Sequence, residues 1–195
     1  MTTTRVAVAV MIAIGGVLGC TSTPPAKGAM EKASAADSTH KHTRSKLSEL
    51  RAREGTMLTL GYTDLGKVSI KAGQYSTDDI AVDAREMRVS DVNSRGLLIT
   101  HDTERDFVDE DEIAPLLAGM DSLFATKANP TKFRMFERSY ETRDGFRFTA
   151  FSSSKGDVSF AVHVGSHARY PDEASARRWR GLVEAGKALL DSLKR

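Results

Sequence analysis

The sequence predicts an α+β domain in which a mostly antiparallel sheet carries two amphipathic helices on one face. Three observations lead to this prediction: two segments with apolar residues at helical spacing, several segments in which apolar and polar residues alternate, and turn signatures between them. The expected order along the chain is four strands, a helix, three strands and a second helix (ββββ-α-βββ-α). A length of 195 residues fits one such domain with a tail.

Two segments have the periodicity of helices that bury one side. The first extends from about residue 112 to residue 126, and Asp111 is expected to cap its first turn. The second extends from about residue 172 to residue 194, where Trp179 belongs to a continuous apolar stripe. Because each helix is apolar on one side only, each needs one partner surface, and a sheet provides it. Residues 45–54 are expected to form a shorter helix.

The alternating segments are predicted to form the sheet. In residues 146–151 and 157–164, apolar side chains alternate along the chain, as in antiparallel strands that have one covered face. The Asp-Gly and Lys-Gly pairs just before these two segments are turn signatures that favour hairpins. In residues 80–89 the apolar positions change parity, which predicts a β-bulge near residues 84–86. The other expected strands are residues 58–62, 67–72, 97–100 and 134–140.

The N-terminus is predicted to be a signal peptide. Arg5 supplies its positive charge, and the apolar stretch of residues 6–19 is shorter than the roughly 20 residues that a transmembrane helix needs. The sequence Val-Leu-Gly-Cys that ends at Cys20 resembles the lipobox of bacterial lipoproteins. This resemblance implies cleavage before Cys20, a diacylglycerol on its sulfur and an acyl chain such as palmitate on the new amine. The alternative interpretations are a conventional signal peptide with an accidental cysteine and an uncleaved helical anchor.

The chain is therefore expected to have three parts. Residues 1–19 are the signal peptide, residues 20–46 are the lipidated cysteine with a flexible linker, and residues 47–195 form a single globular domain. The linker has no aromatic residues and many small or polar ones, so it cannot bury enough apolar surface to offset its ordering entropy. The lipid on Cys20 implies membrane attachment in the cell envelope. Thr21, where Asp would resemble an inner-membrane signal, favours the outer membrane facing the periplasm, if the host has one.

Composition and motifs exclude several classes of function. Lys and Arg number 28 against 26 Asp and Glu, so the chain has no basic field of the kind that binds nucleic acid. Cys20 is the only cysteine, which excludes a disulfide framework and a metal site built from several cysteines. No phosphate-binding glycine loop is present, and no cofactor is expected.

Two segments of the domain carry a second resemblance. Residues 107–113 read Phe-Val-Asp-Glu-Asp-Glu-Ile and lead into the first predicted helix, and residues 140–146 read Tyr-Glu-Thr-Arg-Asp-Gly-Phe. Both resemble an uncharacterised family of small exported bacterial proteins, over about half of the domain. The resemblance implies a shared fold unit and no particular activity.

A run of acidic residues precedes the first predicted helix, between residues 102 and 112. Clustered carboxylates can bind a hard cation such as Ca²⁺, but the run lacks the spacing of an EF-hand loop. Carboxylates at the start of a helix are also favoured by the helix dipole without any metal. We therefore expect capping and solvation here, with a cation site at Asp109 and Asp111 as the alternative.

A second candidate is the exposed face of the predicted sheet. If the helices cover the face that contains Val158, Phe160 and Val162, the opposite face presents an aromatic side chain among hydrogen-bonding neighbours. Such a face suits a peptide, a glycan or an envelope protein, and an ordinary solvated sheet face is the simpler interpretation. The candidate residues are Arg147, Thr149, Phe151, Ser159 and His163.

The function expected from the sequence is a non-catalytic binding or interaction module anchored in the cell envelope through the lipid on Cys20. The alternative is a small hydrolase or a cation-dependent enzyme that uses the acidic segment 102–112 or His163. The sequence names neither the ligand nor the partner.

Overall fold

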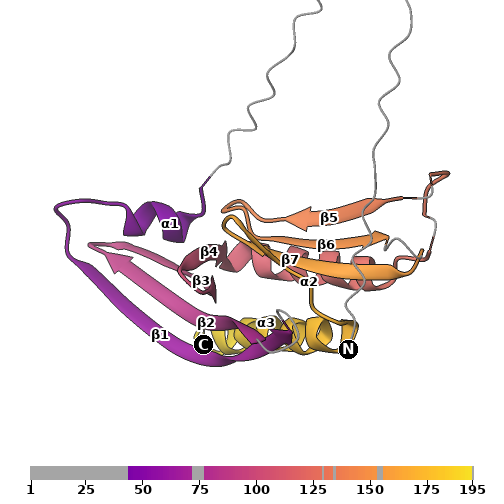
Figure 1. Ribbon diagram of the computed structural model, residues 1–195. Helices are drawn as coiled ribbons and strands as arrows, with labels where there is room; N and C mark the ends of the chain where they lie inside the picture. Colours follow the sequence, from indigo (N-terminus) through magenta and orange to yellow (C-terminus); the bar gives the residue numbers. More distant parts are fainter. Residues whose placement is uncertain (1–43, 72–76, 129, 134, 153–155, 195) are drawn as a thin grey trace, which may run out of the picture. The chain divides into compact units, whose positions relative to one another are not determined.

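A computed structural model describes residues 44–71, 77–128, 130–133, 135–152 and 156–194, which all belong to the compact unit His40–Arg195. The predicted signal peptide, Cys20 and most of the predicted linker lie outside the described residues. The elements are shown in Figure 1. In chain order they are α1 (Lys46–Arg51), β1 (Leu58–Lys71), β2 (Thr77–Val89), β3 (Val92–His101), β4 (Glu104–Asp109), α2 (Glu110–Phe124), β5 (Glu137–Glu141), β6 (Arg147–Ser152), β7 (Val158–Val164), β8 (His167–Arg169) and α3 (Glu173–Ser192).

The strands form two four-stranded antiparallel sheets. Sheet A has the order β1-β2-β3-β4, and sheet B has the order β5-β6-β7-β8. The predicted α+β class with antiparallel strands is therefore confirmed. The expected single sheet is wrong, because the strands form two sheets and the break between them falls at α2, between β4 and β5. Within each sheet, neighbouring strands follow each other directly along the chain.

The bulge in sheet A lies in a different strand from the one predicted. The two strands predicted at residues 58–62 and 67–72 correspond to the single strand β1, which ends at Lys71 and whose register with β2 shifts between Asp64 and Gly66. The Asp64 carboxylate accepts the Gly66 N–H at 2.7 Å, and Gly66 has a φ of +113° that favours glycine. The predicted bulge near residues 84–86 is wrong, because β2 pairs with β3 in one continuous register.

The α2 helix begins earlier than predicted. Its N-cap residue is Asp109 rather than Asp111, and the Glu112 carboxylate accepts the Asp109 N–H at 3.3 Å. This is one half of a capping box, in which the third helical residue reaches back to the cap. Among the described residues, no helix is both long enough and apolar enough to cross a membrane.

The main core lies between the helices and the two sheets. The α3 helix packs on β1 and β2, and α2 packs on α3, β3 and β5. Buried apolar side chains of both sheets and both helices form one cluster. A smaller cluster covers part of the other face of sheet A, where α1 packs on β2, β3 and β4. Its members are Leu47, Leu50, Met87, Val89, Leu98 and Phe107.

Candidate functional site

Carboxylates of the acidic segment 102–112 accept hydrogen bonds from other elements of the fold. Asp109 is 1% exposed, and its carboxylate accepts the N–H groups of Lys46 at 2.8 Å and Leu47 at 3.2 Å. These two donors belong to the first turn of α1, which has no partner for them within the helix. Asp109 therefore caps the start of α1 from a position next to α2.

Arg143 fills the space between the carboxylates of this segment. Its guanidinium lies 3.3 Å from Asp109, 2.7 Å from Asp111 and 3.3 Å from Glu112. Its hydrogen bond to Asp111 lowers the pKa of that carboxyl and raises the pKa of Arg143. Within the described part of the chain, no three His, Cys, Asp or Glu side chains form a group that could hold a metal ion. The arginine supplies the positive charge that the alternative interpretation assigned to a cation at Asp109 and Asp111.

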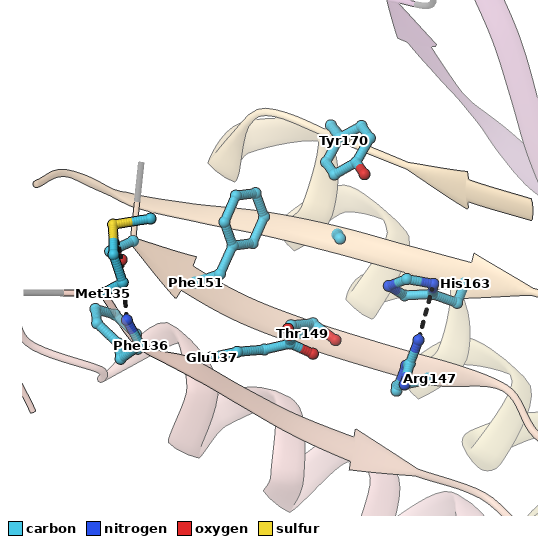
Figure 2. A pocket seen from close by; sticks show the side chains of 10 residues that line it. Met135, Phe136, Glu137, Arg147, Thr149, Phe151, His163 and Tyr170 are labelled. Carbon is cyan, nitrogen blue, oxygen red and sulfur yellow. Dashed lines mark hydrogen bonds between the residues drawn. The ribbon is translucent and has the colours of Figure 1, made fainter. Parts of the chain in front are cut away.

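The outer face of sheet B, opposite the core, is the candidate functional site. Along β6, Arg147, Thr149 and Phe151 point to this face because side chains alternate across a strand. Their partners on β7 are His163, Ala161 and Ser159 respectively. The fold thus brings all five predicted residues to one face. A pocket of about 500 Å³ lies over it (Figure 2) and is lined by Met135, Phe136, Glu137, Arg147, Thr149, Phe151, Ser152, Ala161, His163 and Tyr170.

Four of the five predicted residues line this pocket, and Ser159 does not. Sequence reasoning missed six of the lining residues. Two of these six could have been predicted. Ala161 shares the face with His163 because side chains alternate along β7, and Glu137 shares it because it pairs with Phe151. Tyr170 follows β8, a three-residue strand with no sequence signal of its own.

One end of the pocket is apolar. The rings of Phe151 and Tyr170 meet edge to face with centroids 6.0 Å apart, and Met135 lies at the same end as Phe151 in Figure 2. Tyr170 is 65% exposed and Met135 is 59% exposed. Large apolar side chains that stay exposed around a hollow are typical of binding surfaces.

The other end of the pocket carries the positive charge of Arg147 and the neutral imidazole of His163. Arg147 Nη2 lies 3.3 Å from His163 Nδ1 (Figure 2). Because a guanidinium only donates hydrogen bonds, Nδ1 must accept, and the neutral ring then carries its proton on Nε2. Burial and the charge of Arg147 both lower the pKa of His163. With the Nδ1 lone pair engaged, His163 is poorly suited to act as a general base, and it offers a donor at Nε2 instead.

A buried hydroxyl lies between the two ends. Thr149 is 2% exposed, and its Oγ1 has no hydrogen-bond partner among the described residues. A buried polar group without a partner costs about 1–3 kcal/mol, so such groups are rare in folded proteins. A ligand atom that bonds to Thr149 Oγ1 would remove that cost. Of the buried side-chain atoms without a partner among the described residues, Thr149 Oγ1 is the one that belongs to a residue lining this pocket.

A second hollow adjoins the polar end. It has a volume of about 460 Å³ and shares Arg147 and His163 with the first. Its lining is mostly charged and includes Arg44 and Glu141. The polar group of a ligand in the first pocket would therefore face further hydrogen-bonding side chains.

Comparison with known protein families, with curated proteins and with solved structures finds no match.

Proposed function

We propose that this protein is a lipid-anchored binding protein of the bacterial cell envelope, which binds a peptide segment of an envelope protein on the outer face of sheet B. The observation that carries the proposal is the unpartnered Thr149 hydroxyl between an apolar and a cationic end of one pocket. The lipobox-like sequence that ends at Cys20 supports the anchoring. Two or three acyl chains hold a protein stably on a membrane, whereas a single chain binds reversibly.

The pocket favours a ligand with an apolar side chain next to a carbonyl or carboxylate. The apolar side chain would pack against the rings of Phe151 and Tyr170. The oxygen would accept hydrogen bonds from Arg147 and from His163 Nε2, and its neighbouring amide would reach Thr149 Oγ1. A peptide offers both groups a few ångströms apart. A glycan offers hydroxyls without the apolar side chain and therefore fits this lining less well.

The test measures the binding of synthetic peptides that carry one aromatic side chain and a free C-terminal carboxylate. Fluorescence anisotropy would compare the parent chain with Arg147→Gln and Thr149→Val. We expect Arg147→Gln to weaken binding by about tenfold or more, since hydrogen bonds to charged groups contribute about 1.5–3 kcal/mol. Thr149→Val should weaken binding by about fivefold, from the loss of one neutral hydrogen bond of about 1 kcal/mol.

Two features of the design separate binding from structural damage. Thr149→Val should leave the free energy of unfolding unchanged or raise it, because the hydroxyl has no partner to lose in the described structure. Arg88→Gln is the matched control, since Arg88 is an exposed arginine of sheet A whose guanidinium lies 3.4 Å from Glu86. Equal peptide binding by the parent and both pocket variants would contradict the proposal, as would no binding of any peptide in the set.

A further inference from the structure

The first half of β1 is an uncharged strand at the edge of sheet A. Residues 56–63 read Thr-Met-Leu-Thr-Leu-Gly-Tyr-Thr. Since β1 is the end strand of sheet A, one of its backbone edges has no strand beside it in the described part of the chain (Figure 1). Soluble proteins usually protect such edges with charges, prolines or covering elements, because an open edge pairs with other strands. Residues 56–63 contain neither a charged residue nor a proline.

The covering elements lie elsewhere on sheet A. The α3 helix approaches the second half of β1, where Leu182 lies next to Gly66 and Leu65 lies next to Gly186. The α1 helix packs on β2, β3 and β4. The apolar side chains at the start of β1 and just before it are left exposed: Met57 at 89%, Leu58 at 37%, Leu60 at 40% and Tyr62 at 69%.

Three of these apolar side chains share one face of the strand. Leu58, Leu60 and Tyr62 pair with Val89, Met87 and Arg85 of β2. Val89 and Met87 belong to the cluster under α1, so the exposed side chains extend that cluster toward the edge of the sheet. A groove of about 380 Å³ runs over the same face, with Leu58 and Leu60 among its lining.

We propose that this half of β1 pairs antiparallel with the same segment of a second copy, joining the two copies of sheet A into one continuous sheet. A two-fold axis perpendicular to the sheet keeps the same face up in both copies, so the apolar side chains of both copies lie on one side. The pairing also satisfies the backbone groups of the open edge in both copies at once.

Charge selects the register of this pairing. Centred on Leu60, the pairing sets Leu58 of each copy against Tyr62 of the other, and the next pair, Met57 with Thr63, is also uncharged. Moving the centre by one residue to Gly61 sets the Asp64 carboxylate against an apolar Leu58, and moving it to Thr59 sets the like charges of Glu54 and Asp64 opposite each other. The Leu60-centred register therefore pairs the strand with no charge opposite an apolar side chain.

Disulfide cross-linking tests this register directly. In the full chain carrying Cys20→Ser, no native cysteine remains. Leu60→Cys places two cysteines opposite each other across the axis, about 4.5–5.5 Å apart between Cα atoms, a separation that a disulfide spans. Mild oxidation should then give a covalent dimer. Tyr62→Cys alone is the matched control, because its two copies would be offset by about 13 Å along the strands. Adding Leu58→Cys to Tyr62→Cys should restore the cross-link.

A measurement without cysteines completes the test. Sedimentation equilibrium should show self-association of the Cys20→Ser parent, and Leu60→Lys should abolish it by placing two ammonium groups against each other on the axis. Far-UV circular dichroism checks that the variant remains folded. A monomeric parent, or cross-linking of Leu60→Cys no greater than that of Tyr62→Cys, would overturn the proposal. Either result would instead point to a strand of another protein, or a membrane surface, as the occupant of this edge.

Discussion

The indole of Trp179 stacks on the ring of Phe146, with centroids 5.1 Å apart and an angle of 23° between the planes. Trp179 belongs to α3, which packs on sheet A, and Phe146 directly precedes β6 of sheet B. Trp179 is 1% exposed and Phe146 is fully buried. This pair therefore links sheet B to a helix that packs on sheet A, and it lies behind the strand that carries Arg147 and Thr149.

The first prediction concerns this contact. Trp179→Ala should lower the free energy of unfolding by about 3–5 kcal/mol, the usual cost of truncating a large buried aromatic side chain. Thermal or urea denaturation would detect this loss readily, because it is a large part of a typical free energy of unfolding of roughly 5–15 kcal/mol. Leu193→Ala is the control, since Leu193 follows the same helix and is 59% exposed. Equal melting temperatures for the two variants would contradict the proposed role of the indole.

The helices and most of the strands follow from sequence periodicity, and the exceptions have identifiable causes. Strand β4 was not predicted, because its carboxylates break the apolar alternation. In the fold two of these carboxylates are buried against donors from distant elements: Asp106 accepts the Gly165 N–H at 2.9 Å, and Asp109 accepts two N–H groups of α1. A buried acid of this kind is stable only with its tertiary partner, which a pattern of local residues does not contain.

The same distinction applies to the candidate site. Alternation was enough to place Arg147, Thr149 and Phe151 on one face, since neighbouring residues of a strand point in opposite directions. It did not predict Tyr170, which lies outside the strands and reaches the pocket only through the path of the chain. Met135 falls within the predicted strand 134–140, whereas β5 begins only at Glu137. Nor does any local pattern reveal that the Thr149 hydroxyl lacks a partner.

The second prediction concerns divalent cations. Calcium or magnesium should leave the melting temperature nearly unchanged, because the Arg143 guanidinium already lies among the carboxylates of Asp109, Asp111 and Glu112. A specific site would instead stabilise the fold by about 2.7 kcal/mol at 100 times the dissociation constant. A saturable rise of several degrees that disappears in Asp111→Asn would establish a cation site. Asp111 suits this control because its side chain is 56% exposed.

The third prediction concerns the anchor. Cys20→Ser should prevent the incorporation of labelled fatty acid and either leave the precursor uncut or release a soluble product, because the lipid is expected on the only cysteine sulfur of the chain. Metabolic labelling followed by electrophoresis measures both effects. Thr21→Ser, a conservative change at the next residue, is the control and should be labelled like the parent. Label retained by Cys20→Ser would exclude this mode of attachment.

The last prediction concerns Asp106, whose carboxylate is buried at 3% exposure and accepts the Gly165 N–H. Burial raises its pKa from 3.8 to about 6, and the nearby carboxylates of Asp144 and Glu104 act in the same direction. The folded state therefore holds a proton between pH 4 and 6 that the unfolded state has already lost, so stability falls as pH rises through this window. At about 1.36 kcal/mol per pKa unit, the full loss is on the order of 3 kcal/mol and is complete above about pH 7.

Asp106→Asn isolates this effect, because the amide oxygen can still accept the Gly165 N–H while the charge is absent at every pH. Urea unfolding at several pH values between 4 and 8 would give the free energy of unfolding of the variant and of the parent. We expect the difference to grow in favour of the variant as pH rises through about 6 and to stay constant above pH 7. Groups that do not interact with Asp106 titrate equally in both proteins and cancel. A difference independent of pH would mean that Asp106 is ionised in the fold throughout this range and that its burial is compensated by a partner other than a proton.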